Sequence, residues 1–194
     1  MISCPERAGV LSRTLSNLSG TDWADAPVHV QIDDGTGKDH RERQTRCAYK
    51  ALEHAYAQGA DHILFLEDDL EFNAHFRHNL RHCRPIFRSG GMASLYNPGL
   101  TEHACDLNGP VRFIKPQVAF GSQALVIPRG VVQHFLENWD DVAGMQDVKV
   151  FRLFERLKAP LLYHAPSLVQ HVGSKSVWGG GFHEARDFDP EWRA

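Results

Sequence analysis

Three consecutive acidic residues, Glu67, Asp68 and Asp69, directly follow the most apolar run of the chain, residues 62–66. Three adjacent carboxylates repel one another unless a cation neutralises them. Because side chains alternate along an extended chain, Glu67 and Asp69 are expected to point one way and Asp68 the other. Ligation by oxygen alone suits Mg²⁺ or Mn²⁺, with diphosphate oxygens and water completing the shell. An acidic turn that leads into a helix N-terminus is the alternative interpretation.

The acidic triplet needs a scaffold, and the rest of the sequence predicts an α/β sheet, because short apolar runs alternate with helical patterns. Strands are expected at 1–4, 28–32, 62–66, 92–96, 123–127, 161–163 and 168–172, and helices around 11–18, 48–56, 76–83, 131–139 and 150–157. The run 62–66 is apolar on both faces, which predicts a strand in the middle of a covered sheet. Asn73 is expected to cap the helix that follows. Ligands of open α/β sheets bind beyond the carboxyl ends of the strands, where the triplet lies.

Length, charge and cysteine content limit the class of protein. A chain of 194 residues suits one domain, and a hydrophobic fraction of 42% can form a sizeable core. The net charge of −3 indicates neither nucleic acid nor an anionic membrane as a partner, and no run approaches eighteen apolar residues. Cys4, Cys47, Cys83 and Cys105 form no Cys-x-x-Cys pair, which favours free thiols and a cytoplasmic location.

The acidic segment resembles a known family of enzymes. Residues 66–71, Leu-Glu-Asp-Asp-Leu-Glu, resemble the acidic DXD motif of glycosyltransferases with the GT-A fold, and the form closest to it is the Glu-Asp-Asp of N-acetylglucosaminyltransferase I. Residues 30–36 resemble the Asp-Asp-Gly-Ser segment of bacterial family 2 glycosyltransferases, and residues 5–7 resemble their first strand–helix turn. The resemblance extends over residues 1–90 and returns at 145–147 and 166–173.

This resemblance implies both a fold and an activity. The implied fold is α/β of the GT-A type, a Rossmann-like mixed central sheet flanked by helices. It would form one domain over residues 1–194, with a nucleotide-sugar-binding half at 1–90 and an acceptor-binding and catalytic half at 91–194. The implied activity is transfer of a sugar from a nucleotide-diphosphate-sugar, with a UDP-sugar expected, to an acceptor hydroxyl with inversion. The implied cofactor is Mn²⁺ or Mg²⁺.

The resemblance also assigns donor-binding roles to particular residues. Pro5 and Arg7 fall where the first donor contacts are made. Asp33 or Asp34 falls where an acid binds the uracil, although Asp-Asp-Gly also forms hairpin turns. Arg46 falls where a helical arginine reaches the base or the diphosphate, although a lone helical arginine is usually a surface charge.

The remaining roles concern the metal and the proton. By resemblance Asp69 ligates the cation, and Glu67 and Asp68 hold ribose or sugar hydroxyls. His171 matches the late histidine that completes the metal shell, although a histidine in an apolar segment is often structural. Asp147 matches the general base of inverting members, with a plain helix N-cap as the alternative.

The sequence leaves the acceptor and the oligomeric state open. A glycan, a lipid-linked saccharide, a protein or a hydroxymethylated pyrimidine in phage DNA are all compatible with these motifs. The basic residues between 75 and 88 favour a polyanion mildly, and their arginines share one helix face only if the helix continues past Pro85. A non-catalytic nucleotide-sugar or metal-binding module and a metal-dependent phosphoesterase are the alternative functions.

Overall fold

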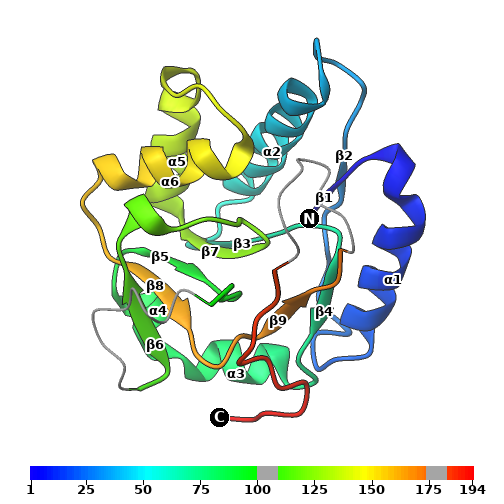
Figure 1. Ribbon diagram of the computed structural model, residues 1–194, viewed down its shortest axis with the longest axis vertical. Coiled ribbons are helices and arrows are strands. Elements are labelled where there is room, and N and C mark those ends of the chain that lie inside the picture. The colour runs from blue at the N-terminus through cyan, green and yellow to red at the C-terminus, as the bar shows by residue number, and fades with distance from the viewer. Residues whose placement is uncertain (100–108, 174–182) are drawn as a thin grey trace.

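A computed structural model of the protein describes residues 1–99, 109–173 and 183–194 (Figure 1). Its largest sheet has five strands, β3 (His62–Leu66), β7 (Ala124–Pro128), β5 (Met92–Ser94), β8 (Leu161–His164) and β6 (Val111–Ile114), in that spatial order. Strands β5 and β8 run parallel, and the other neighbours run antiparallel. The architecture is therefore mixed α/β with a mixed sheet flanked by helices, as expected.

The N-terminal region forms a separate β-α-β unit. Strand β1 (Ile2–Ser3) leads through a 3₁₀ turn (η1, Pro5–Arg7) into helix α1 (Ala8–Ser19), and the chain returns as strand β2 (Gln31–Ile32), parallel to β1. The strand expected at 28–32 thus pairs only over its last two residues. The backbone N–H of Asp33 donates to the carbonyl oxygen of Ser3, so the pairing places Asp33 at the carboxyl end of both strands.

Helices cover both faces of the sheet. Helices α2 (His40–Ala57), α5 (Arg129–Asn138) and α6 (Gln146–Arg156), with the turns η3 (Pro116–Val118) and η4 (Trp139–Asp141), lie on one side, above the sheet in Figure 1. Helices α3 (Phe76–His82) and α4 (Arg84–Arg88) lie on the other. Strand β3 contributes to both cores, since Ile63 and Phe65 join one apolar cluster and Leu66 the other.

Two antiparallel strands connect distant parts of the chain. Strand β4 (Leu70–Phe72) pairs with β9 (Val169–His171), and Leu70 lies opposite His171. The backbone N–H of Val172 donates to the carbonyl oxygen of Asp69 at 3.0 Å and extends this pairing by one step. The register therefore brings the last residue of the acidic triplet beside a histidine that lies 102 positions later in the chain.

The position of β3 corrects one expectation. The strand lies at the edge of the five-stranded sheet, with β7 as its neighbour, and not in the middle. Its apolar character is still explained, because both of its faces are covered by side chains of the two cores. An apolar run thus indicates that both faces of a strand are covered. It does not indicate whether another strand pairs along each of its two edges.

Asn73 does not cap a helix in the expected way. Its side chain is fully buried and accepts hydrogen bonds from the backbone N–H of His75 and from the amide of Asn79. Its own amide donates to the carbonyl oxygens of Asp189 and Trp192. Asn73 therefore orders the turn before α3 and fastens the C-terminal segment, residues 183–194, to the fold.

The basic stretch is divided between two short helices. Helix α3 ends at Cys83, whose φ of −77° and ψ of 67° are not helical, and Pro85 lies in the first turn of α4. The four arginines at 77, 81, 84 and 88 consequently do not lie along one continuous helix. Within the described residues, no helix is both long enough and apolar enough to cross a bilayer.

The described cysteines carry free thiols, as expected. These are Cys4, Cys47 and Cys83. Cys105 and the glycine-rich segment 179–181 lie outside the described residues.

Candidate functional site

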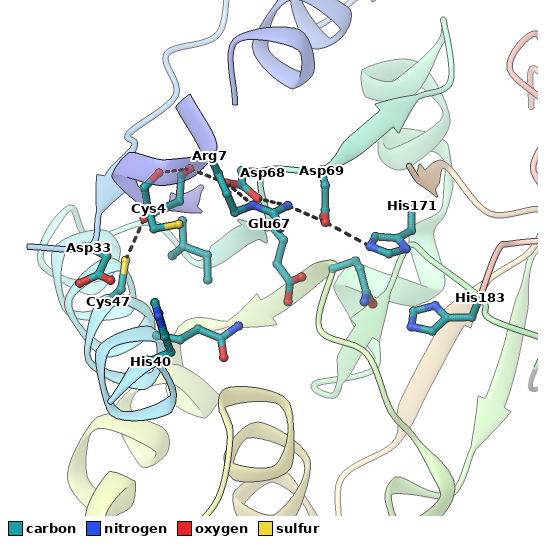
Figure 2. Close-up of a pocket in the computed structure, with 14 residues that line it drawn as sticks. Cys4, Arg7, Asp33, His40, Cys47, Glu67, Asp68, Asp69, His171 and His183 are labelled. Atoms are coloured by element: carbon teal, nitrogen blue, oxygen red, sulfur yellow. Dashed lines mark hydrogen bonds and ion pairs between the residues drawn. The ribbon is translucent and has the colours of Figure 1, made fainter. Parts of the chain in front are cut away.

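A cavity lies at the carboxyl ends of β1, β2 and β3 (Figure 2). Six residues predicted from the sequence line it: Arg7, Asp33, Glu67, Asp68, Asp69 and His171. Figure 2 shows the acidic triplet in the centre, with Asp33 and His40 toward one end and His171 and His183 toward the other. The sheet therefore gathers residues from distant parts of the chain, which is the arrangement expected of a ligand site in an α/β protein.

Asp68 holds the N-terminal unit against the end of β3. Its carboxylate accepts hydrogen bonds from the Ser3 hydroxyl and from Nε of Arg7 at 3.1 Å, and it forms an ion pair with Nη2 of Arg7 at 2.7 Å. Its carbonyl oxygen accepts a hydrogen bond from Thr14 on α1. Because the carboxylate is enclosed by these partners, its main effect in this structure is to position Arg7.

Asp69 lies between Arg7 and His171. Its Oδ2 lies 2.6 Å from Nη2 of Arg7 and 3.1 Å from Nε2 of His171. Burial opposes ionisation of Asp69, but the hydrogen bond and charge of His171, together with Arg7, lower its pKa overall. Burial likewise opposes protonation of His171, and the hydrogen bond and charge of Asp69 outweigh it and raise the pKa. Arg7, Asp69 and His171 thus form one hydrogen-bonded group.

Gly173 keeps a space open between Asp69 and His171. A Cβ atom at this position would lie 2.6 Å from Oδ2 of Asp69 and 2.7 Å from Nε2 of His171. Any side chain would therefore displace both groups. The absence of a Cβ leaves one point that is close to a carboxylate oxygen and an imidazole nitrogen at once.

These two residues fit a divalent cation as a partial ligand set. Ligands at adjacent corners of an octahedron, about 2.1 Å from the ion, are about 3.0 Å apart, close to the 3.1 Å between Asp69 Oδ2 and His171 Nε2. Oδ1 of Asp69 is also buried without a hydrogen-bond partner. In the described ranges, however, no three His, Cys, Asp or Glu residues group together as metal ligands. A cation here would need further ligands from a diphosphate or water.

Glu67 belongs to a different network. The Ser122 hydroxyl donates to Oε1 of Glu67 at 2.9 Å, and the amide of Gln146 donates to the Ser122 oxygen at 2.9 Å. Burial, followed by the charge of Asp69, raises the pKa of Glu67 to about 7. The charge of Asp147 contributes to this shift in the same direction, so Asp147 is electrostatically coupled to the cavity.

Unsatisfied polar atoms gather around the cavity. Among the described residues, buried side-chain atoms without a hydrogen-bond partner include Gln44 Oε1, Asp69 Oδ1, Gln123 Oε1 and His171 Nδ1, all from residues that line it. Such atoms are uncommon in proteins, because each costs about 1–3 kcal/mol when it is left unpaired. Their concentration at one place indicates a site whose polar partners are supplied by a ligand.

The structure separates the two acids that the sequence left as alternatives. Asp33 is buried in the wall of the cavity, where Oδ2 accepts from Nε of Arg43 at 2.8 Å and Oδ1 from the backbone N–H of Gly35 at 2.8 Å. Asp34 is exposed and pairs with Lys50 outside the cavity. Asp33 is therefore the acid of this pair that a ligand in the cavity could contact.

Arg46 does not lie where the resemblance places a donor-binding arginine. Its side chain is 49% exposed, lies 3.9 Å from Glu42 on the same helix, and lines a different groove. His40, Gln44 and Cys47, spaced i, i+4 and i+7 on α2, face the cavity instead. The helical period that connects Gln44 to the buried Cys47 is the signal by which the sequence could have identified this face.

Pro5 and Asp147 lie near the cavity but do not line it. Pro5 is the first residue of η1 and shapes the turn that carries Arg7. Asp147 lies in the first turn of α6, and its Oδ1 accepts from the backbone N–H of Val148 at 2.8 Å. The N-cap of α6 is Met145, so Asp147 is not the helix N-cap of the alternative interpretation, and its charge acts on Glu67.

His183 is a site residue that the sequence analysis missed. It lines the cavity, and its ring stacks on that of His171 with centroids 5.1 Å apart. The Tyr96 hydroxyl donates to the carbonyl oxygen of His183 and lies 2.8 Å from its Nδ1. Burial, followed by the charge of His171, lowers the pKa of His183. No pattern in the sequence connects residue 183 with residue 171.

Comparisons with known proteins do not assign the chain to a family. No model of a known protein family matches it, and a search of curated protein sequences finds no significant match. The interpretation of the site therefore depends on its own geometry and chemistry.

Proposed function

We propose that this protein is a metal-dependent glycosyltransferase of the GT-A type, which transfers a sugar from a nucleotide-diphosphate-sugar, with a UDP-sugar expected, to an acceptor hydroxyl. One observation carries the proposal: Asp69 and His171 meet over Gly173 at the carboxyl ends of the strands, in a cavity lined by unpaired polar atoms. Two protein ligands and open positions suit a cation that is bound together with a diphosphate.

The two ends of the cavity suit the two parts of such a donor. Asp33, His40 and Gln44 form a polar pocket for the nucleoside, and the Gln44 amide offers a donor and an acceptor for the edge of a base. Asp69 and His171 at the other end would hold Mn²⁺ or Mg²⁺. When bound, that ion would supply positive charge to the departing diphosphate.

The chemistry that the side chains supply is proton removal and alignment. The Asp147 carboxylate accepts the proton of the acceptor hydroxyl as that oxygen bonds to the anomeric carbon. The bond from the anomeric carbon to the phosphate oxygen breaks, and its electron pair leaves with the nucleoside diphosphate. Attack from the face opposite the leaving group inverts the anomeric configuration. The Ser122 and Gln146 network holds Glu67 in place to bind a sugar hydroxyl.

The alternative functions have less support. A metal-dependent phosphoesterase needs several histidine and aspartate ligands in one group, and the described part of the chain offers no such group of three. A non-catalytic nucleotide-sugar-binding module would use the same cavity, but it gives no role to a carboxylate at position 147. Donor turnover separates the binding module from the transferase.

The test is release of the nucleotide from a panel of sugar nucleotides in the presence of Mn²⁺, as a nucleoside diphosphate from UDP-, GDP- and TDP-sugars and as CMP from CMP-sugars. We expect one donor class to be turned over slowly with water and faster with the acceptor. The Asp147→Asn variant should bind that donor normally and lose about 10²- to 10⁴-fold in transfer rate. Binding without turnover by the wild type would favour the binding module, and normal transfer by the variant would show that Asp147 is not the general base.

A further inference from the structure

A second groove lies beside the cavity, between the segment 116–120 and helix α6. The residues that define it are Gln117, Phe120, Asp147, Phe151, Arg152 and Glu155. Phe120 of this groove and His183 of the cavity are in ring contact, so the groove and the cavity are neighbours.

Phe120 offers an aromatic surface to the groove and contacts a residue of the cavity. Its side chain is 41% exposed, although a phenylalanine exposed to water gains no burial energy. Its ring contacts that of His183 edge-on, with centroids 5.9 Å apart, and His183 lines the cavity. Phe151, which is 4% exposed, adds a second aromatic side chain to the same groove. An exposed ring beside a charged cavity is suited to stacking against a flat apolar face of a ligand.

Polar groups lie around these aromatic side chains. The amide of Gln117 donates to Oε1 of Glu155 at 2.7 Å, which joins η3 to α6. Oδ1 of Asp147 is held by the backbone N–H of Val148, and its Oδ2 has no hydrogen-bond partner within the described residues. The guanidinium of Arg152 is exposed beside them. The groove thus combines an aromatic platform with hydrogen-bonding groups suited to hydroxyls.

The charge of the groove distinguishes between acceptor classes. Two carboxylates, Asp147 and Glu155, outnumber the single guanidinium of Arg152, so a phosphate backbone would be repelled. The exposed Arg81 lies on α3 and the exposed Arg84 and Arg88 lie on α4, and these two helices cover the face of the sheet opposite to α6 (Figure 1). A nucleic acid held on those arginines would not be directed into this groove.

We infer that the groove is the acceptor site and that it binds a neutral saccharide, with a sugar ring stacked on Phe120 and a hydroxyl directed to Asp147. This inference rests on the proposed function and specifies its acceptor. The stacked ring contributes affinity, and Asp147 selects the hydroxyl that reacts.

The test compares two exposed phenylalanines. Phe120→Ala removes the platform, and Phe113→Ala is the matched control, because Phe113 is 40% exposed on β6 and does not line the groove. Binding to an array of neutral glycans and the acceptor KM are measured with UDP and Mn²⁺ or the active donor present. We expect Phe120→Ala to raise the acceptor KM about tenfold and Phe113→Ala to leave it unchanged.

Three results would overturn the inference. Equal effects of Phe120→Ala and Phe113→Ala, or failure of every neutral glycan to bind, would remove the groove as a saccharide site. Transfer to hydroxymethylated DNA that is unaffected by Phe120→Ala would assign the acceptor to a polyanion. The absence of donor binding and hydrolysis in the wild type would instead contradict the proposed function, and the inference with it.

Discussion

Three adjacent carboxylates have three different surroundings in this protein. Glu67 contacts the Ser122 network, Asp68 clamps the N-terminal unit through Ser3 and Arg7, and Asp69 meets His171. The alternation of side chains along the chain predicts that Asp68 diverges from the other two, but Asp68 and Asp69 share Nη2 of Arg7, and Glu67 is the carboxylate that turns to other partners. The resemblance placed His171 with Asp69, whereas the partners Ser3 and Ser122 were not predicted, because they come from distant segments.

Gln44 provides a prediction at the scale of single residues. Its side-chain oxygen is buried in the cavity without a partner, whereas Arg46, two residues later, faces another groove. Gln44→Ala should therefore weaken binding of the preferred nucleoside diphosphate about tenfold, the value of one hydrogen bond to a buried group. Arg46→Ala should leave that affinity unchanged. Isothermal titration calorimetry with UDP, GDP and ADP measures both, and the opposite order would restore Arg46 as the donor-binding residue.

At the scale of secondary-structure elements, the sequence predicted those helices and strands whose apolar pattern lies within the segment itself. Strand β3 and helix α1 were predicted because their apolar spacing is complete within the segment. Strands β4 and β6 were missed because each has only three or four residues and pairs with a strand far away in the sequence. The edge position of β3 was missed for a related reason, since sheet order depends on pairings between distant strands.

The β4–β9 pair makes a testable prediction through Gly173. In Gly173→Ala the new Cβ must displace Asp69 or His171, so Mn²⁺-dependent binding of nucleotide should be reduced at least tenfold while the protein stays folded. Gly130→Ala in α5 is the matched control, because a Cβ there meets nothing within 4 Å. Thermal shift with and without Mn²⁺ is the measurement. Equal Mn²⁺ dependence in the two variants would show that Gly173 does not border a metal site.

At the scale of the whole molecule, the C-terminal segment holds the site together. It is fastened through Asn73, and the side chain of Ser167 donates to Asp187 within it. This attachment presents His183 to the cavity and covers the buried His164, whose ring lies 5.7 Å from that of Trp192. Contacts of this kind between distant segments produce no periodic pattern in the sequence. His183 was for that reason not predicted as a site residue.

His164 connects this docking to the pH dependence of stability. Burial lowers the pKa of His164, and the opposing effects of its hydrogen bond to the Pro166 carbonyl oxygen and of the Asp187 charge are smaller. The folded state therefore keeps His164 neutral, and the unfolded chain binds a proton below its ordinary pKa of about 6.5. The contribution of His164 to stability is complete above that pH. It is lost as the pH falls, by up to about 1.4 kcal/mol per pH unit.

Urea unfolding between pH 7.5 and 5 measures this contribution. His164→Gln should reduce the slope of unfolding free energy against pH in this window, whereas His82→Gln, on the exposed end of α3, should preserve it. An identical slope in the wild type and in both variants would show that His164 is not the group that takes up the proton on unfolding.

The central claim is that Asp69 and His171 bind a divalent cation together with a nucleoside diphosphate. The most direct measurement is the stabilisation of the wild type and of Asp69→Asn by UDP, with Mn²⁺ and with EDTA. The account predicts stabilisation of the wild type by about 2.7 kcal/mol at a hundredfold excess of ligand over Kd, only with Mn²⁺, and loss of the Mn²⁺-dependent part in Asp69→Asn. Equal stabilisation in EDTA, or none by any nucleoside diphosphate, would contradict it.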